Sequence, residues 1–310
     1  GTKPRNIDTG FEPQFFLIKN SSNNGEDWFM IDTMRGTGTF NNACRQLKAN
    51  LSNSESGTEI GVYSSGITLN ENSTAFNASG HTYIYMAIRR PHKPPEAATE
   101  VFDIEYQTNS GTGSANFTTG FASDAMLFTR TDDATDNYFP TRLGAGKYLP
   151  STHSAAAAYY DGGTYAFFDE PTGQMRQAAL GGTSDYIFYN FKRAPGFMDV
   201  VNYTGVSSSP ANVSHNLGVV PEMMIVKQRS RAGSWVIYHS ALGATKFCYF
   251  ESTSAAVTSN LGWADTAPTA SVFTVGTVGW DTNYSGQEHI ALLFATLPGI
   301  SKVGSYTGTG

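Results

Sequence analysis

Neighbouring carboxylates are the first residues of this sequence that could do acid–base chemistry. Three such pairs occur, at residues 26–27, 132–133 and 169–170. A glycosidase needs two carboxyl groups flanking one bond, whereas adjacent residues of a strand point to opposite faces of the sheet. We therefore expect these pairs to lie in solvated loops, and we predict that the chain is not an enzyme.

Nucleophiles and metal ligands are equally scattered. No Gly-x-Ser-x-Gly motif occurs, and the six histidines are scattered without a recognisable catalytic pattern of carboxylate or serine partners. Cys44 and Cys248 lie far apart without a CxxC motif, so we expect two free thiols and no zinc site. Residues 131–137, TDDATDN, are rich in oxygen ligands but lack the spacing of an EF-hand loop. We predict no metal and no cofactor, and a cation in this loop is the less favoured alternative.

Aromatic side chains in the last third of the chain could bind a sugar. The stretches LGWADTAPTA and VGWDTNYSGQE hold Trp263, Trp280 and Tyr284, with Asp281 and Asn283 between the last two. Sugar C–H faces pack on exposed rings beside hydrogen-bonding groups. These five residues form the candidate ligand-binding site, with a host-surface glycan as the ligand. The alternative is that the rings belong to the core.

The composition limits the classes of protein to consider. Of the 310 residues, 15% are charged, 40% are hydrophobic and 32 are glycines, a balance typical of short strands joined by turns. The formal net charge is -6 and no cluster of lysine and arginine recurs, which argues against a nucleic-acid partner. The sequence also lacks an apolar run long enough for membrane insertion.

Strand-like phrases recur three times, at a spacing of about 100 residues. Each phrase begins with glycine, bends, and continues as an apolar strand that ends in a polar residue. The three copies are GFEPQFFLIKN (10–20), GFASDAMLFTR (120–130) and GVVPEMMIVKQ (218–228). Behind them follow aromatic strands around Trp28, Tyr138 and Trp235. We expect Trp28 and Trp235 to lie in the core, and we expect both faces of the fully apolar strands to be covered.

Proline-containing segments separate the copies, because proline fixes φ and removes an amide donor. They lie at residues 91–100, 194–196 and 297–299, and we expect them to be short linkers. The sequence therefore predicts an all-β protein of tandem antiparallel β-sandwich, jelly-roll-like repeats. The predicted units are residues 1–95 (unit 1), 96–195 (unit 2) and 196–298 (unit 3).

The end of the sequence repeats the start of unit 3. FKRAPGFMDVVNYTG at 191–205 returns as FATLPGISKVGSYTG at 294–308. Since the first copy leads into a unit, residues 299–310 are expected to be the first strand of a further repeat.

Several of these phrases together resemble a known family. FFLIKNSSNNGEDWFMIDTMRG, FKRAPGFMDVVNYTG, GSWVIYHSALGATK and ALLFATLPGISKVGSYTGTG are similar to the tandem repeats of virion-associated proteins in marine bacteriophages. Those proteins are tail-fibre or appendage chains described as concanavalin A-like. Unit 2 departs most from the pattern, with Ser123, Thr129 and Tyr138 where units 1 and 3 have proline, lysine and tryptophan.

The resemblance implies a structural virion protein, a segment of a fibre or appendage on the outer surface of the particle. Its expected partners are copies of itself, as a homo-oligomer such as a trimer, and other virion proteins. The alternative is a glycan-binding module for host recognition. The resemblance supplies no catalytic residues.

Overall fold

The structure is a computed structural model that describes residues 5–34, 44–108, 115–132, 137–144, 165–166, 174–177 and 184–310. The described residues form strands and two short 3-10 helices, η1 (Ala98–Glu100) and η2 (Arg142–Gly144). Every pair of neighbouring strands in the sheets runs antiparallel. The prediction of an all-β antiparallel fold is confirmed.

Unit 1 holds two sheets, with the strand orders β5-β4-β3-β2-β8 and β1-β7-β6. Side chains of β2 alternate inward, so that Phe16 and Ile18 enter the core. The strands are β1 (Arg5–Asp8), β2 (Pro13–Asn20), β3 (Trp28–Asp32), β4 (Cys44–Lys48), β5 (Ser56–Thr58), β6 (Ile60–Tyr63), β7 (Gly66–Leu69) and β8 (Tyr83–Arg89).

Unit 2 also holds two sheets in its described part, with the orders β11-β14-β9 and β10-β13-β12. The strands are β9 (Phe102–Gln107), β10 (Ala115–Thr118), β11 (Ala125–Arg130), β12 (Tyr165–Ala166), β13 (Gln174–Gln177) and β14 (Tyr186–Phe191). Residues 133, 153 and 169–170, and with them part of the proposed oxygen-rich loop, lie outside the described residues.

Unit 3 has a sheet of order β15-β22-β17-β18-β19-β20 and the pair β16-β21. The strands are β15 (Met198–Thr204), β16 (Ala211–Ser214), β17 (Met223–Gln228), β18 (Val236–His239), β19 (Lys246–Tyr249), β20 (Val257–Thr258), β21 (Val272–Val275) and β22 (Glu288–Phe294). Each sheet of the described chain takes all its strands from one predicted unit. The division into separate domains stays a prediction.

The recurring phrases have the same backbone. Their initial glycines, Gly10, Gly120 and Gly218, all have φ between 73° and 78°, a region that favours glycine. The strands that follow are β2, β11 and β17, and each pairs with the last strand of its unit, β8, β14 and β22. The sequence repeat is therefore a repeat of structure.

Two apolar cores explain why β17 and β22 are buried on both faces. One core, inside unit 3, contains Met224 and Val226 on one side and Phe273 of the β16-β21 pair on the other. The opposite face of β17 carries Ile225 into a central core that all three units share. We expected both faces of the fully apolar strands to be covered, and for β17 and β22 the packing agrees with this expectation.

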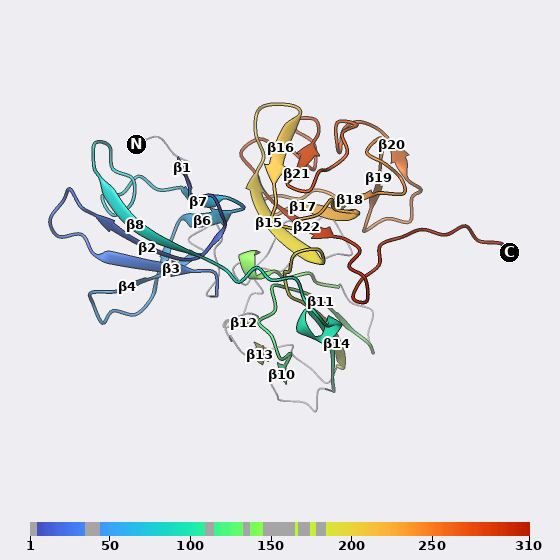
Figure 1. The fold of residues 1–310 in the computed structure, drawn as a ribbon, viewed down its shortest axis with the longest axis horizontal. Coiled ribbons are helices and arrows are strands. Elements are labelled where there is room, and N and C mark those ends of the chain that lie inside the picture. Colours follow the sequence, from blue (N-terminus) through green and yellow to red (C-terminus); the bar gives the residue numbers. More distant parts are fainter. Residues whose placement is uncertain are drawn as a thin grey trace.

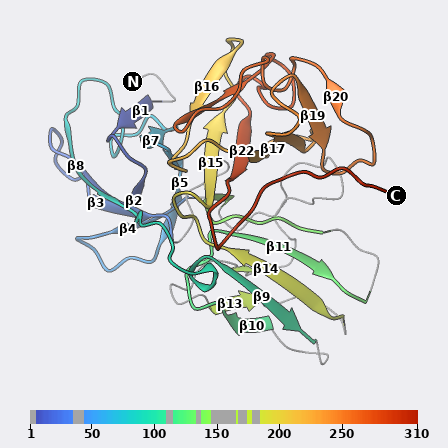
Figure 2. The same ribbon diagram turned by 45° about the vertical axis from the view of Figure 1, so that its right-hand side comes forward.

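The central core passes through the segment between units 2 and 3. Ala194, Phe197, Met198 and Val200 are all buried in it, together with residues of unit 1. We expected short linkers between the units, and the structure differs, because the flanks of the Pro-Gly turn are packed. The three units lie around a common centre (Figures 1 and 2), an arrangement closer to the blades of a propeller than to a row of separate sandwiches.

The repeated Pro-Gly segments form the same turn. The amide of Ala194 donates to the carbonyl of Met198 at 3.0 Å, and the amide of Leu297 donates to the carbonyl of Ser301 at 3.1 Å. The glycine of each turn, Gly196 and Gly299, has φ of 78° and 79°. The first turn leads into β15, so the second shows where the chain leaves unit 3.

Candidate functional site

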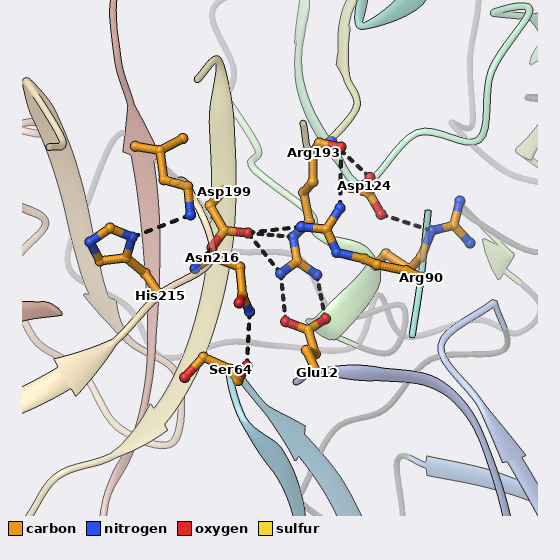
Figure 3. Close-up of polar contacts among 10 residues, drawn as sticks. Glu12, Ser64, Arg90, Asp124, Arg193, Asp199, His215 and Asn216 are labelled. Atoms are coloured by element: carbon orange, nitrogen blue, oxygen red, sulfur yellow. Dashed lines mark hydrogen bonds and ion pairs between the residues drawn. The ribbon is translucent and has the colours of Figure 1, made fainter. Parts of the chain in front are cut away.

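A buried group of charged side chains lies where the three units meet (Figure 3). We call it the junction cluster. It consists of five charged residues and Asn216. They come from the segments before β2 and β11 (Glu12, Asp124), from the segments after β8 and β14 (Arg90, Arg193), from β15 (Asp199) and from the loop after β16 (Asn216).

Arg193 is the centre of the junction cluster. Its two terminal nitrogens each donate to one carboxylate oxygen of Glu12 at 2.6 Å. Its Nε donates to Oδ1 of Asp199 at 2.8 Å, and its backbone amide donates to the Asp124 carboxylate at 2.8 Å. All three side chains that meet at the guanidinium, those of Arg193, Glu12 and Asp199, are almost fully buried. One arginine thus joins carboxylates from all three units.

Asp199 is bound from several sides. Its second oxygen accepts the amide of Asn216 at 2.7 Å, and Arg90 lies 3.4 Å from its first oxygen. The side-chain amide of Asn216 donates in turn to the carbonyl of Ser64 in unit 1 at 2.9 Å. These contacts connect β15 to units 1 and 2.

The arginines occupy one position of the repeat. Arg90 and Arg193 stand two residues after Ile88 and Phe191, which face equivalent residues of β2 and β11. In unit 3 the same position is Thr296, whose amide donates to the carboxylate of Glu222, as the amide of Arg193 does to Asp124. We did not predict this cluster from the sequence. Its signal is that the second arginine of RRP (89–91) and the arginine of KRAPG (192–196) stand at the same position of the repeat.

Electrostatics fixes the charge state of the cluster. Burial disfavours both charges, but the carboxylates of Glu12 and Asp199 outweigh it and raise the pKa of Arg193. For Asp199, burial alone would raise the pKa, and the charges of Arg193 and Arg90 outweigh it, so the pKa is lowered. Both groups therefore stay ionised and hydrogen-bonded. Such groups are suited to holding units together rather than to transferring protons.

The five predicted ligand-binding residues lie in different environments. Trp263 is fully buried in the core of unit 3, where its ring meets Tyr238 edge-on at 5.8 Å. Asn283 is also fully buried, and it anchors loops by accepting from the amide of Val206 and donating to the carbonyl of Ser208. These two residues have structural contacts and do not face solvent.

Trp280, Asp281 and Tyr284 are the partly exposed members of that set. The ring of Trp280 packs on Phe247 at 4.8 Å, and the guanidinium of Arg231 lies over the ring of Tyr284 at 4.0 Å. Partial burial raises the pKa of Asp281. These three side chains, on one loop of unit 3, are the part of the predicted set that a ligand could reach.

A buried lysine supports the loop beside them. Lys227 is fully buried, and its Nζ donates to the carbonyl of Gly233 at 2.5 Å. Burial lowers the pKa of Lys227 to about 8, although Glu251 and Asp281 oppose the shift. In unit 1, Lys19 donates in the same way to the carbonyl of Glu26. The recurring lysine therefore holds the loop between β2 and β3 in unit 1 and the loop between β17 and β18 in unit 3.

His289 is the other buried titratable group of unit 3. Its ring stacks on that of Tyr203 at 4.8 Å, its Nδ1 lies 2.9 Å from the carbonyl of Gln287, and its Nε2 accepts the amide of Tyr284 at 3.4 Å. This arrangement suits the neutral ring protonated on Nδ1. Burial lowers its pKa to about 4.

The two recurring tryptophans, Trp28 and Trp235, differ in burial. Trp235 is buried in the central core, where Phe139 of unit 2 meets it edge-on at 6.3 Å. Trp28 is only partly buried, and the adjacent Phe29 takes the inward position instead. The core expectation is confirmed for Trp235 and is wrong in part for Trp28.

The described residues contain no group of three or more histidine, cysteine or acidic side chains placed to hold a metal ion. Within the same part of the chain, no helix has the length and apolar character needed to cross a membrane.

Sequence comparison assigns a family. A model described as a domain of unknown function, DUF7483, matches residues 3–91 and 190–310. No curated protein matches the chain at a significant level. The unmatched residues between the two stretches correspond closely to unit 2, the repeat that departs most from the other two. Since the match covers about two thirds of the sequence, the chain belongs to the DUF7483 family.

Proposed function

We propose that this member of the DUF7483 family is a structural protein of a bacteriophage virion, a segment of a fibre or appendage on the outer surface of the particle. The observation that carries the proposal is the junction cluster, which joins three repeated β units through Arg193, Glu12 and Asp199. A rigid body made of repeats suits a mechanical role. The resemblance to virion-associated tandem repeats of marine phages supports the same role.

The chemistry of the chain is in keeping with a role that needs no reaction. The residues that recur between units are mainly apolar side chains, glycines and prolines. The polar residues that recur have structural contacts, as in the lysine that holds a loop and the arginine of the junction cluster. The buried carboxylates of the junction cluster are held by arginine and by backbone amides. We therefore propose a protein without enzymatic activity, whose partners are copies of itself and other virion proteins.

The test is the location of the protein in phage particles. An antibody against the 310-residue chain should label a fibre or appendage in immunogold electron microscopy of purified particles, and peptides of the chain should be found in the same particles by mass spectrometry. Particles from a phage that lacks the gene are the matched control. Absence of the chain from purified particles would refute the proposed role.

A glycan-binding role is the second candidate, and Trp280, Asp281 and Tyr284 favour it, because they are partly exposed on one loop. An aromatic ring beside a carboxylate is a common sugar-binding arrangement. The test is binding of the whole chain to a glycan array and to host cells. Binding that Trp280→Ala abolishes and Trp28→Ala preserves would favour this role. Absence of binding would leave the structural role alone.

A further inference from the structure

The first strand of a unit occupies the same place in units 2 and 3. Strand β9 pairs antiparallel with β14, with Phe102 opposite Phe191, and β15 pairs antiparallel with β22, with Met198 opposite Phe294. In both sheets this first strand lies beside the last strand of its own unit. It pairs with the edge of β14 or β22 that faces away from β11 or β17. The last strand is therefore paired on both sides.

Unit 1 differs at this place. Its last strand, β8, pairs with β2 on one side, and no strand of the described residues pairs with its other side. Strand β1 cannot be the counterpart of β9, because it pairs with β7 in the smaller sheet, as β10 and β16 pair with β13 and β21. Within the described residues, no strand of unit 1 thus occupies the place that β9 and β15 fill.

The open edge of β8 is apolar and exposed. Ile84, Met86 and Ile88, which alternate along one face of β8, are each 48–50% exposed, and Tyr85 on the opposite face is 47% exposed. An exposed edge strand with apolar side chains is a template for pairing with another chain, and proteins usually protect it with charges or a covering segment. The exposed apolar side chains of β8 therefore favour pairing of its open edge with an added strand.

The C-terminal residues repeat the pattern of β15, the strand that occupies this place in unit 3. Residues 301–307 follow the Pro298-Gly299 turn as β15 follows the matching Pro195-Gly196 turn, and both stretches end in Tyr-Thr-Gly. Beyond the bridge at Ser301, these residues belong to no strand of the described structure. Tyr306 is 94% exposed, whereas its counterpart Tyr203 stacks on His289.

We propose that residues 301–307 of one molecule add as an edge strand to β8 of a second copy, and that this pairing joins the copies head to tail. The repeat sets the register. Ile88 and Phe294 both lie opposite the fifth residue after the recurring glycine, Phe15 in unit 1 and Met223 in unit 3. Because Met198 faces Phe294, its counterpart Ser301 should face Ile88.

This register gives matching contacts on both faces. Val303 would lie opposite Met86, within the exposed apolar row of β8, and Tyr306 would lie opposite Tyr83, which packs against the central core. Cross-strand aromatic and aliphatic pairs stabilise antiparallel sheets, and the main-chain hydrogen bonds of the added strand supply affinity. Val303 would have to keep or exchange its present contact with the Thr296 hydroxyl.

A second copy is the partner because of where the two elements lie. Figures 1 and 2 both place β8 on one side of the molecule and the C-terminal segment on the other, beyond unit 3. A head-to-tail contact uses two different surfaces, so unless the copies close into a ring, each assembly keeps one unpaired β8 edge and one unpaired C-terminal segment at its ends. Repetition produces a filament, which deepens the proposed fibre role but rests only on the internal repeat.

Two complementary variants test the proposal. Ser305→Pro/Tyr306→Pro damages the tail, because amides of adjacent strand residues point to opposite edges and one of them must face β8. Met86→Lys/Ile88→Lys damages the edge at positions that are already exposed, so the fold should tolerate it. In sedimentation velocity, the unmodified chain should form oligomers that grow with concentration, and each variant alone should be monomeric.

The decisive measurement is the mixture of the two variants. The tail variant keeps an intact edge and the edge variant keeps an intact tail, so together they should form a dimer and nothing larger. Thr309→Pro, beyond the pairing residues, should associate like the unmodified chain. A monomeric unmodified chain, a closed trimer that persists in the tail variant, or a mixture that stays monomeric would overturn the proposal. None of these outcomes bears on the presence of the chain in phage particles.

Discussion

At the scale of single residues, Arg193 is the arginine that holds two buried carboxylates, those of Glu12 and Asp199. Its guanidinium holds Glu12 and Asp199 with distances of 2.6–2.8 Å, and all three side chains are almost fully buried. Removing one partner of a buried ion pair leaves an uncompensated charge, which costs far more than the pair itself contributes. Arg90 shares Asp199 at the longer distance of 3.4 Å, so it can replace only part of the missing charge.

We predict that Arg193→Met lowers the free energy of unfolding by about 3–5 kcal/mol. Arg90→Met should have a smaller effect, because Asp199 keeps its contact with Arg193. The matched control is Lys93→Met, which removes the exposed ion pair with Glu96 and should leave the melting temperature unchanged within error. Circular dichroism melts measure all three. Equal effects of the two arginine variants would show that Arg193 is not the centre of the cluster.

A second residue-scale prediction concerns acid stability. His289 has its pKa lowered by burial from 6.5 to about 4, so the unfolded chain binds a proton in this range that the folded chain does not. Its contribution to stability is therefore fully present above pH 6.5 and is lost as the pH falls toward 4. The full change is on the order of 3 kcal/mol.

His289→Gln, which cannot titrate, should make this slope smaller by the contribution of one histidine. His92, whose pKa burial also lowers to about 4, titrates in both proteins and keeps its own contribution to the slope. Melting temperatures measured at a series of pH values between the two pKa values compare the variant with the unmodified chain. The same slope in both proteins would mean that other groups cause it. Lys227 titrates above this range, because its pKa is about 8. The pKa of Asp281 is raised from 3.8 by burial, and this carboxyl group is present in both proteins, so its contribution cancels in the comparison.

At the scale of the elements, the two Pro-Gly turns form a matched pair in different surroundings. Gly196 and Gly299 have nearly the same φ, 78° and 79°, but a Cβ at Gly196 would lie 3.3 Å from Leu297, whereas the space around Gly299 is open. A left-handed conformation costs an alanine about 1–2 kcal/mol. The turn at Gly196 is fixed between β14 and β15, so it cannot relax.

We predict that Gly196→Ala lowers the melting temperature by several degrees, because its strain of about 1–2 kcal/mol is imposed on the central core. Gly299→Ala should leave the melting temperature of the monomer nearly unchanged, since no strand of the described residues pairs with the segment behind that turn. Calorimetry of both variants is the measurement. A larger effect at Gly299 would contradict the assignment of the first turn to the core.

The elements are also the level at which the sequence was most informative. The strands that begin at Gly10, Gly120 and Gly218 could be predicted because their signals are local, namely a glycine that permits positive φ and an apolar run. The Pro-Gly turn could be predicted for the same reason. The glycine and apolar run recur three times and the Pro-Gly turn twice, and repetition separates these signals from chance.

Long-range features of the fold left no comparable local signal. Glu12 and Arg193 are 181 residues apart, and neither lies in a pattern that names its partner. The burial of Trp263 and Asn283, both predicted as ligand contacts, depends on which strands close over the loops. The packing of the Ala194 segment depends on the other two units. Such features depend on contacts between units, and the sequence of one repeat does not determine those contacts.

At the scale of the whole molecule, the shared core determines how the chain should unfold. The central core takes residues from every unit, including Ile60, Phe139 and Trp235, and the junction cluster joins the same units by charge. Units that bury their apolar faces against one another lose that burial together. Independent spacers, by contrast, would melt one after another.

We predict one cooperative thermal transition for the whole chain, with a calorimetric enthalpy close to the van't Hoff enthalpy. Phe139→Ala removes the unit 2 ring that meets Trp235 edge-on, and it should lower the stability of the whole molecule by about 3–5 kcal/mol rather than that of unit 2 alone. Near-ultraviolet circular dichroism, to which the buried Trp235 and Trp263 of unit 3 contribute, should therefore shift to the same lower temperature as the far-ultraviolet signal. A transition of unit 3 that does not move in Phe139→Ala would mean that its own core, around Phe273 and Met224, is sufficient and that the shared core is only a contact surface.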